Sequence, residues 1–222
     1  MSYYNLTFSN LATIETRPIP LYRVDPDESH PPRRAVDALR QGQVIVFPTE
    51  TLYALSCRID DEAAVRRVFA IKRRPPAGAL PVLLADVAQL DEYGSAVSDD
   101  ARRLAARLWP GPLTLIVRRS ARVPSVITGG ASAVGLRVPD HPLARALVAA
   151  VGTPLVGTSA NTHGQSAPVN AQQVVFDLGD QIDMVIDGGR TRLGAPSTVV
   201  DATSSPVRVV RVGVIPSQTV LA

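Results

Sequence analysis

The chain has 222 residues, of which 45% are hydrophobic and 19% are charged, and its formal net charge at pH 7 is +3. This composition excludes an intrinsically disordered chain and allows one large domain with a substantial core. No apolar run approaches the roughly 20 residues of a membrane-spanning helix, and the N-terminal stretch lacks the pattern of a secretory signal. With one cysteine, Cys57, the chain forms no internal disulfide, so we expect a cytoplasmic location and no membrane partner.

The N-terminal residues 1–31 are rich in proline and show no clear periodicity. We expect them to form an extended lead-in with an edge strand over residues 21–24, followed by one domain over residues 32–222. Within that domain, residues 33–41 have the pattern of a helix that ends at Gly42.

A short apolar run follows at residues 44–47, which is typical of a strand buried on both faces, and we expect Pro48 to end it. Thr49, Glu50, Thr51 and Tyr53 then follow in a loop, at the position where open α/β sheets bind ligands. The alternative is a capped turn, in which the two threonine hydroxyls satisfy local backbone groups.

Further helices and strands alternate along the chain. Helices are expected from Asp60–Glu62 to residue 71, in a short segment from Asp86, and over residues 101–108, 141–151 and 170–178. Strands are expected over residues 80–85, 113–117, 134–138, 154–157, 184–186, 198–201 and 207–210, with a second polar loop at residues 158–161. This order predicts a single α/β domain with a twisted mixed parallel and antiparallel sheet flanked by helices.

The basic residues are unevenly divided, since 22 are arginines and one, Lys72, is a lysine. A lone lysine suggests a site that needs a compact ammonium, which we expect to line the surface of that site. The alternative is chance within an arginine-rich composition.

Several standard sites are absent from the sequence. It contains no P-loop, no dinucleotide-binding glycine fingerprint, no zinc-binding His-Glu-x-x-His helix and no nucleophile elbow. Its histidines, His30, His141 and His163, are far apart in the sequence, so we expect no protein metal site. The remaining hydroxyls, amide and cations suit phosphate and carboxylate ligands, and chemistry that works by positioning and charge neutralisation.

Seven ordered motifs resemble those of the YrdC family, the threonylcarbamoyl-AMP synthases. They are Pro48-Thr49-Glu50-Thr51-Leu52-Tyr53, Lys72-x-Arg74-Pro75, Trp109-Pro110-Gly111-Pro112-Leu113-Thr114, Gly135-Leu136-Arg137-Val138-Pro139, Ser159-Ala160-Asn161, Ser197-Thr198-Val199-Val200-Asp201 and Arg211-Val212-Gly213. The resemblance runs from about residue 33 to about residue 215. It implies a YrdC-like fold with a basic concave face.

The resemblance also implies a nucleotidyltransferase that converts L-threonine, bicarbonate and ATP into threonylcarbamoyl-AMP and pyrophosphate. The product would serve threonylcarbamoyladenosine modification of tRNA through downstream transfer proteins, and Mg²⁺ would arrive with ATP. By the same resemblance, the side chains that bind ATP phosphates are Lys72, Arg74, Asn161 and Arg211, the first two acting as the catalytic cations. Those that bind threonine or its carbamate are Thr49, Arg137, Ser159 and Ser197, with Arg137 on the carboxylate.

The sequence departs from the family pattern at three places. Ala54 replaces a glycine, Ala79-Leu80 replaces a common Pro-Leu, and Leu83 replaces a histidine that some members place near the threonine. Structural alternatives also stay open for Thr49 and Ser197 as caps, and for Arg137 and Arg211 as solvated cations.

An RNA-binding module without catalysis is the alternative function, because a sequence pI near 9.4 allows weak binding of RNA or tRNA. Only 5% of residues are aromatic, which gives little support to stacking on single strands. A third possibility is another carboxylate- or phosphate-binding enzyme on the same sheet.

Overall fold

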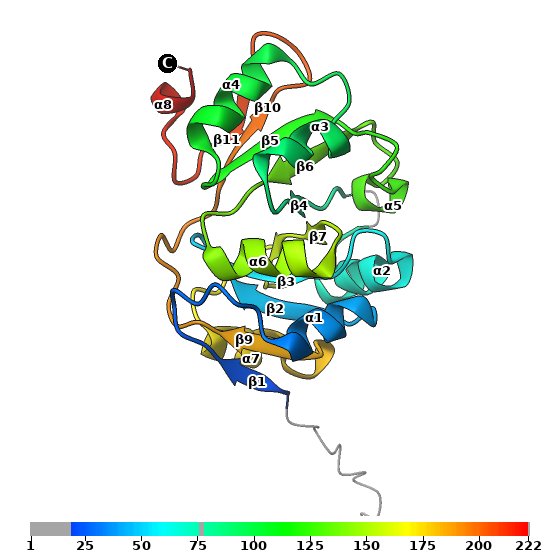
Figure 1. Cartoon of the computed structure of the whole chain (residues 1–222), viewed down its shortest axis with the longest axis vertical. Helices are drawn as coiled ribbons and strands as arrows, with labels where there is room; N and C mark the ends of the chain where they lie inside the picture. The colour runs from blue at the N-terminus through cyan, green and yellow to red at the C-terminus, as the bar shows by residue number, and fades with distance from the viewer. Residues whose placement is uncertain (1–18, 76–77, 222) are drawn as a thin grey trace, which may run out of the picture.

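The computed structural model describes residues 19–75 and 78–221, and its strands form one five-stranded and one six-stranded sheet, stacked along the long axis (Figure 1). The expected mixed α/β class is confirmed, although the strands divide between two sheets rather than forming one. The five-stranded sheet has the order β1 (Leu21–Arg23), β9 (Met184–Asp187), β2 (Ile45–Pro48), β3 (Tyr53–Ser56), β8 (Thr158–Ser159). The six-stranded sheet has the order β11 (Arg208–Arg211), β10 (Thr198–Asp201), β5 (Leu113–Arg118), β6 (Ala133–Arg137), β4 (Val82–Leu83), β7 (Leu155–Val156).

Most of the helices begin and end where the sequence predicts. The α-helices are α1 (Arg33–Arg40), α2 (Glu62–Ile71), α3 (Leu90–Tyr93), α4 (Asp99–Leu108), α5 (Ser125–Thr128), α6 (Pro142–Val151), α7 (Ala171–Leu178) and α8 (Ser217–Leu221), and the 3₁₀ helices are η1 (Val87–Gln89) and η2 (Gly179–Gln181). Asp61, Ser98 and Asn170 accept backbone N–H groups at the first turns of α2, α4 and α7, as N-cap side chains do. The short helices α5 and α8 were not predicted, because four or five residues carry too little periodicity.

Alternation along β2 explains how two helical layers cover the five-stranded sheet. Ile45 and Phe47 belong to an apolar cluster with residues of α1 and α6, whereas Val44 and Val46 belong to a second cluster with residues of α2 and α7. Helices α1 and α6 lie on the near face of this sheet in Figure 1, and α7 lies on the far face. The prediction that residues 44–47 are buried on both faces is confirmed.

Parts of two predicted loops are strands. Strand β2 ends at Pro48 as predicted, and residues 49–52 form the loop that follows it. Tyr53 pairs with Pro48 at the start of the antiparallel strand β3, so the prediction that Tyr53 lies in the loop is wrong. Residues 158–159, also predicted as loop, form β8, which pairs with β3.

Gly157 connects the two sheets, since it lies between β7 of the six-stranded sheet and β8 of the five-stranded sheet. A Cβ atom at this position would lie 2.3 Å from Cγ of Leu83, so no side chain fits without displacing Leu83. Next to this crossing, the carbonyl of Cys57 accepts the N–H of Val156 at 2.8 Å. The Cys57 side chain is fully buried, and burial raises the pKa of its thiol, with smaller contributions from nearby aspartates.

The expected edge strand near residues 21–24 is confirmed as β1, which runs parallel to β9. The rest of the expected lead-in, residues 1–18, lies outside the described residues, and the domain boundary at residue 32 stays a prediction. Within the described ranges, no helix has both the length and the apolar character needed to cross a membrane.

Candidate functional site

A cavity of about 600 Å³ is lined by residues of both sheets and of the adjoining chain segments. All eight side chains predicted to bind ATP or threonine line it: Thr49, Lys72, Arg74, Arg137, Ser159, Asn161, Ser197 and Arg211. The fold therefore brings together residues that are far apart in the sequence, from residue 49 to residue 211.

Positive charge dominates this cavity. Its described lining contains Lys72, Arg74, Arg137 and Arg211 but no aspartate or glutamate. Burial, and secondarily the charge of Arg74, lowers the pKa of Lys72 to about 8. Burial, and secondarily the charge of Arg137, also lowers the pKa of Arg211. Lys72 and Arg74 repel each other, and the described lining offers them no carboxylate, so an anion between these two cations is favoured.

Lys72 follows the last residue of α2 and joins that helix to the end of β8 and the segment after it. Its Nζ donates hydrogen bonds to the carbonyls of Ser159 at 2.6 Å and Asn161 at 2.8 Å. The whole residue is only 3% exposed. Lys72 therefore lines the cavity as expected, but it is buried and hydrogen-bonded to backbone carbonyls rather than exposed to solvent. A compact ammonium satisfies both carbonyls in this space, which gives a structural reason for a lysine here.

Asn161 offers an acceptor rather than a donor. Its Nδ2 donates to the carbonyls of Thr162 at 3.0 Å and Gln165 at 2.7 Å, so both amide hydrogens are used and the side-chain orientation is fixed. Its Oδ1 is buried and has no hydrogen-bond donor among the described residues. A direct contact with phosphate oxygens, as the sequence predicted, would need a donor that this arrangement does not leave free.

The turn between β2 and β3 uses the Thr49 hydroxyl internally. Its Oγ1 donates to the carbonyl of Leu52 at 2.7 Å and lies 2.9 Å from Oγ1 of Thr51. The N–H groups of Thr51 and Leu52 also point at this oxygen, each at 3.3 Å. The geometry is that of the capped turn considered as the alternative, and a contact between Thr49 and a substrate stays a prediction.

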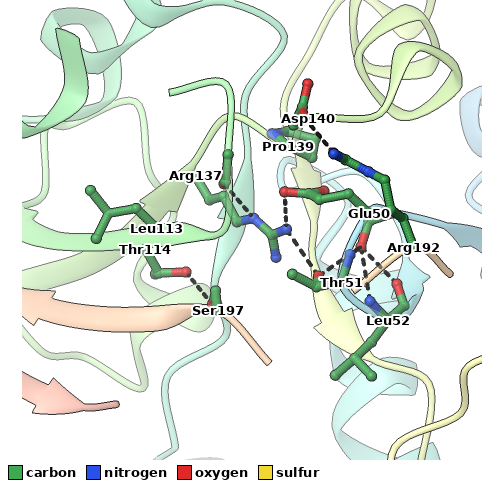
Figure 2. Close-up of polar contacts among 12 residues, drawn as sticks. Glu50, Thr51, Leu52, Leu113, Thr114, Arg137, Pro139, Asp140, Arg192 and Ser197 are labelled. Atoms are coloured by element: carbon green, nitrogen blue, oxygen red, sulfur yellow. Dashed lines mark hydrogen bonds and ion pairs between the residues drawn. The ribbon is translucent and has the colours of Figure 1, made fainter. Parts of the chain in front are cut away.

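Arg137 lies at the end of β6 and is 7% exposed, so the alternative of a solvated cation does not hold for it. Its Nε donates to the carbonyl of Gly111 at 3.2 Å, and its Nη2 donates to Oγ1 of Thr51 at 2.9 Å and forms an ion pair with Oε1 of Glu50 at 2.6 Å (Figure 2). The same figure shows Ser197 on the far side of this guanidinium from Glu50. Arg137 is thus held by three partners, and its Nη1 has no hydrogen-bond acceptor among the described residues.

Ser197 precedes β10 and is tied to two neighbours. Its Oγ lies 2.8 Å from Oγ1 of Thr114, and Nη2 of Arg211 donates to the Ser197 carbonyl at 2.8 Å and approaches its Oγ at 3.3 Å. Gly213 allows this close approach, since a Cβ there would lie 2.2 Å from the carbonyl oxygen of Pro196.

Three polar residues of this region were given no individual role from sequence, although two of them lie in the loop expected at the ligand site. Glu50 and Thr51 lie within the first motif and Thr114 within the third, so membership of a motif was the available signal. Leu83, which stands where some family members have a histidine, lines the cavity with an apolar side chain.

Comparison with known proteins identifies a family. A family model for the Sua5/YciO/YrdC domain, described as telomere recombination, matches residues 37–213. The chain is 40% identical over 188 residues to a threonylcarbamoyl-AMP synthase of Pyrococcus abyssi, a match that covers 85% of this chain and 55% of that protein. It is 41% identical over 177 residues to a threonylcarbamoyl-AMP synthase of Vibrio cholerae, which covers 79% of this chain and 94% of that protein.

A solved structure has the same fold. The structure of Pyrococcus abyssi Sua5 in complex with L-threonine superposes with a TM-score of 0.84 at 38% identity, covering 91% of this chain and 59% of that one. The chain thus spans little more than half the length of the Pyrococcus relative but nearly all of the Vibrio relative.

Proposed function

Because the chain belongs to the Sua5/YciO/YrdC family, we propose that it is a threonylcarbamoyl-AMP synthase, a nucleotidyltransferase that uses L-threonine, bicarbonate and ATP. The observation that carries the proposal is the single cavity in which all eight predicted residues meet, with four cations and no carboxylate in its described lining. Such a cavity suits a polyanion together with an amino acid.

The phosphates of ATP are assigned to the Lys72 and Arg74 side of the cavity. Both side chains border it, and their mutual repulsion is relieved when an anion lies between them. The same two charges would stabilise the pyrophosphate that leaves. Arg211 would add a third positive charge from the opposite sheet.

Threonine is assigned to the Arg137 and Ser197 side. Arg137 is already oriented by Gly111, Thr51 and Glu50, so its Nη1 edge is the one that would receive the substrate carboxylate. Ser197 and Ser159 would contact the hydroxyl or carbamate of the substrate. Thr49 would act through the shape of its turn, because its hydroxyl already has local partners.

The chemistry needs no protein nucleophile. The amine of threonine would form a C–N bond with the carbon of bicarbonate while a C–O bond breaks and water leaves. An oxygen of the resulting carbamate would attack the α-phosphorus of ATP, and the bond from that phosphorus to the bridging oxygen would break as pyrophosphate leaves. The protein would contribute alignment of the two ligands and stabilisation of the developing charge on the pyrophosphate.

Magnesium fits this site as an ion brought by ATP. The described residues contain no cluster of three or more His, Cys, Asp or Glu side chains that could hold a metal. Oδ1 of Asn161, a residue of the cavity lining, is buried and accepts no hydrogen bond from the described residues. It would accept a hydrogen bond from a magnesium-bound water. Bound magnesium would supply neutralisation of phosphate charge.

The test measures pyrophosphate release by the full chain with ATP, L-threonine and bicarbonate, and identifies the nucleotide product by mass. We expect release to require both L-threonine and bicarbonate. Pyrophosphate release that does not depend on L-threonine or on bicarbonate would contradict the proposal. The absence of release, with binding of tRNA retained, would also contradict it and would favour the RNA-binding alternative.

A further inference from the structure

Glu50 is a buried carboxylate that stands behind the cavity and outside its lining. The residue is 1% exposed, and its Oε1 lies 2.6 Å from Nη2 of Arg137 (Figure 2). Neither carboxylate oxygen accepts an aligned hydrogen bond from the described residues, so Oε1 is held by charge and Oε2 has no partner. A buried carboxylate with so few hydrogen bonds is costly, which makes its presence here informative.

Arg137 is the positive charge that compensates Glu50. Arg192, the other arginine of this region in Figure 2, is bound by Asp140 at 2.5 Å. His141 is also near, but burial lowers the pKa of its ring and outweighs the opposite effect of Glu50, so the ring is neutral near pH 7. Glu50 and Arg137 are therefore each other's counter-charge.

This pairing divides the cations of the cavity into two kinds. Lys72 and Arg74 have no carboxylate in the described lining and keep their charge for a ligand, as does Arg211. Arg137 is neutralised from behind. A triphosphate placed at Arg137 would gain little attraction and would meet the repulsion of Glu50, whereas a zwitterionic amino acid has no net charge for Glu50 to repel.

We propose that Glu50 is a specificity-determining residue, whose buried carboxylate cancels the charge of Arg137 and so reserves that part of the cavity for the amino acid instead of the triphosphate. Glu50 acts through Arg137 and touches neither ligand. The identity of the two ligands rests on the proposed function, while the effect of Glu50 on anion binding does not.

The test compares the wild-type chain with Glu50→Gln by titration calorimetry, using inorganic tripolyphosphate and L-threonine as probes. In the wild type, saturating tripolyphosphate should leave the Kd of L-threonine nearly unchanged. In Glu50→Gln, tripolyphosphate should bind at least about tenfold more tightly and raise the Kd of L-threonine by at least about tenfold, because Arg137 is then an uncompensated cation.

Matched variants separate the loss of the Glu50 charge beside Arg137 from the loss of a negative charge elsewhere on the protein. Glu92→Gln removes the same charge from an exposed side chain on α3 and should behave as the wild type. Glu50→Asp keeps the carboxylate and should restore binding of threonine in the presence of tripolyphosphate. The double variant Glu50→Gln/Arg137→Gln removes both charges and should lose the added affinity for tripolyphosphate.

Equal affinity for tripolyphosphate in the wild type and Glu50→Gln would overturn the inference, and so would an equal gain in Glu92→Gln. If Glu50→Gln does not fold in dilute buffer, tripolyphosphate should restore its near-UV circular dichroism by replacing the missing carboxylate, and failure to do so also counts against the inference. A wild type that makes no product but shows the tripolyphosphate difference would refute the proposed function and leave the role of Glu50 supported.

Discussion

At the scale of single residues, Lys72 combines two tasks that usually belong to different side chains. Its ammonium binds one carbonyl at the end of β8 and one in the segment that follows, and it also borders the cavity with Arg74. A substitution here should therefore change both stability and ligand binding.

We expect Lys72→Arg to lower threonine-dependent pyrophosphate formation by at least about tenfold, or roughly 1.4 kcal/mol. The planar guanidinium is larger than the ammonium, so we also expect the free energy of unfolding to fall by about 1–3 kcal/mol. Steady-state kinetics and urea denaturation measure the two effects. Arg73→Lys, the reverse exchange at the exposed neighbouring residue, is the control and should change neither. Unchanged stability in Lys72→Arg would show that the two carbonyl contacts contribute little.

The pKa of Lys72 gives the site a pH dependence. Since burial and Arg74 lower this pKa to about 8 from the usual 10.5, the unfolded chain binds more protons than the folded one between these values. The contribution of Lys72 to the free energy of unfolding should thus rise with pH from about 8 to 10.5, while affinity for ATP should fall as the ammonium loses its proton above about pH 8. Calorimetric Kd values for ATP at pH 7, 8 and 9 test this, with Lys72→Arg as a variant that stays charged. The same pH trend in both proteins would rule out Lys72 as its source.

Sequence reasoning found the site residues more readily than it found their roles. Eight side chains were assigned because they lie in ordered motifs, and all eight line the cavity. The motifs carry no information on local partners, such as the carbonyls bound by Lys72 or the amide hydrogens used by Asn161. Those partners depend on how distant segments meet, which a single sequence does not reveal.

At the scale of secondary-structure elements, the crossing between β7 and β8 is the feature on which the site depends. Five residues, 155–159, pass from one sheet to the other and end at Ser159, whose carbonyl binds Lys72. The sequence predicted a strand followed by a polar loop. Two-residue strands are too short to show alternation, and their membership of different sheets is decided by long-range pairing.

We expect Gly157→Ala to lower the free energy of unfolding by about 1–3 kcal/mol, because the new methyl group would overlap the buried Leu83 side chain. Chemical denaturation measures the change. Leu83→Ala should also destabilise the protein by leaving a void, but the double variant should lose less than the sum of the two. Strict additivity would mean that Gly157 is needed for its backbone and not for the space beside Leu83.

At the scale of the whole molecule, the cavity lies where the two sheets meet and takes residues from both. Thr49 follows β2 and Ser159 ends β8 in the five-stranded sheet, while Arg137 ends β6 and Ser197 precedes β10 in the six-stranded sheet. A ligand that contacts all of these stabilises the two sheets together.

We therefore expect ATP and L-threonine to raise protection from hydrogen exchange in both sheets, at β3 and β8 as well as at β6 and β10. A ligand at 100 times its Kd should add about 2.7 kcal/mol to the free energy of unfolding. Native-state hydrogen exchange with and without the two ligands measures this. Protection limited to one sheet would indicate that the ligands contact only that sheet.

The buried Cys57 makes the region of the junction between the sheets observable without an introduced cysteine. It is the only cysteine in the chain, and its carbonyl accepts a hydrogen bond from β7 at the point where the two sheets meet. Because the thiol is fully buried, a thiol reagent added in excess can modify the protein only when the structure around Cys57 opens, so the rate of modification counts those opening events. The natural sequence thus contains a probe of opening near the junction of the two sheets. A slower modification of Cys57 in the presence of a ligand measures how strongly the ligand stabilises the closed structure.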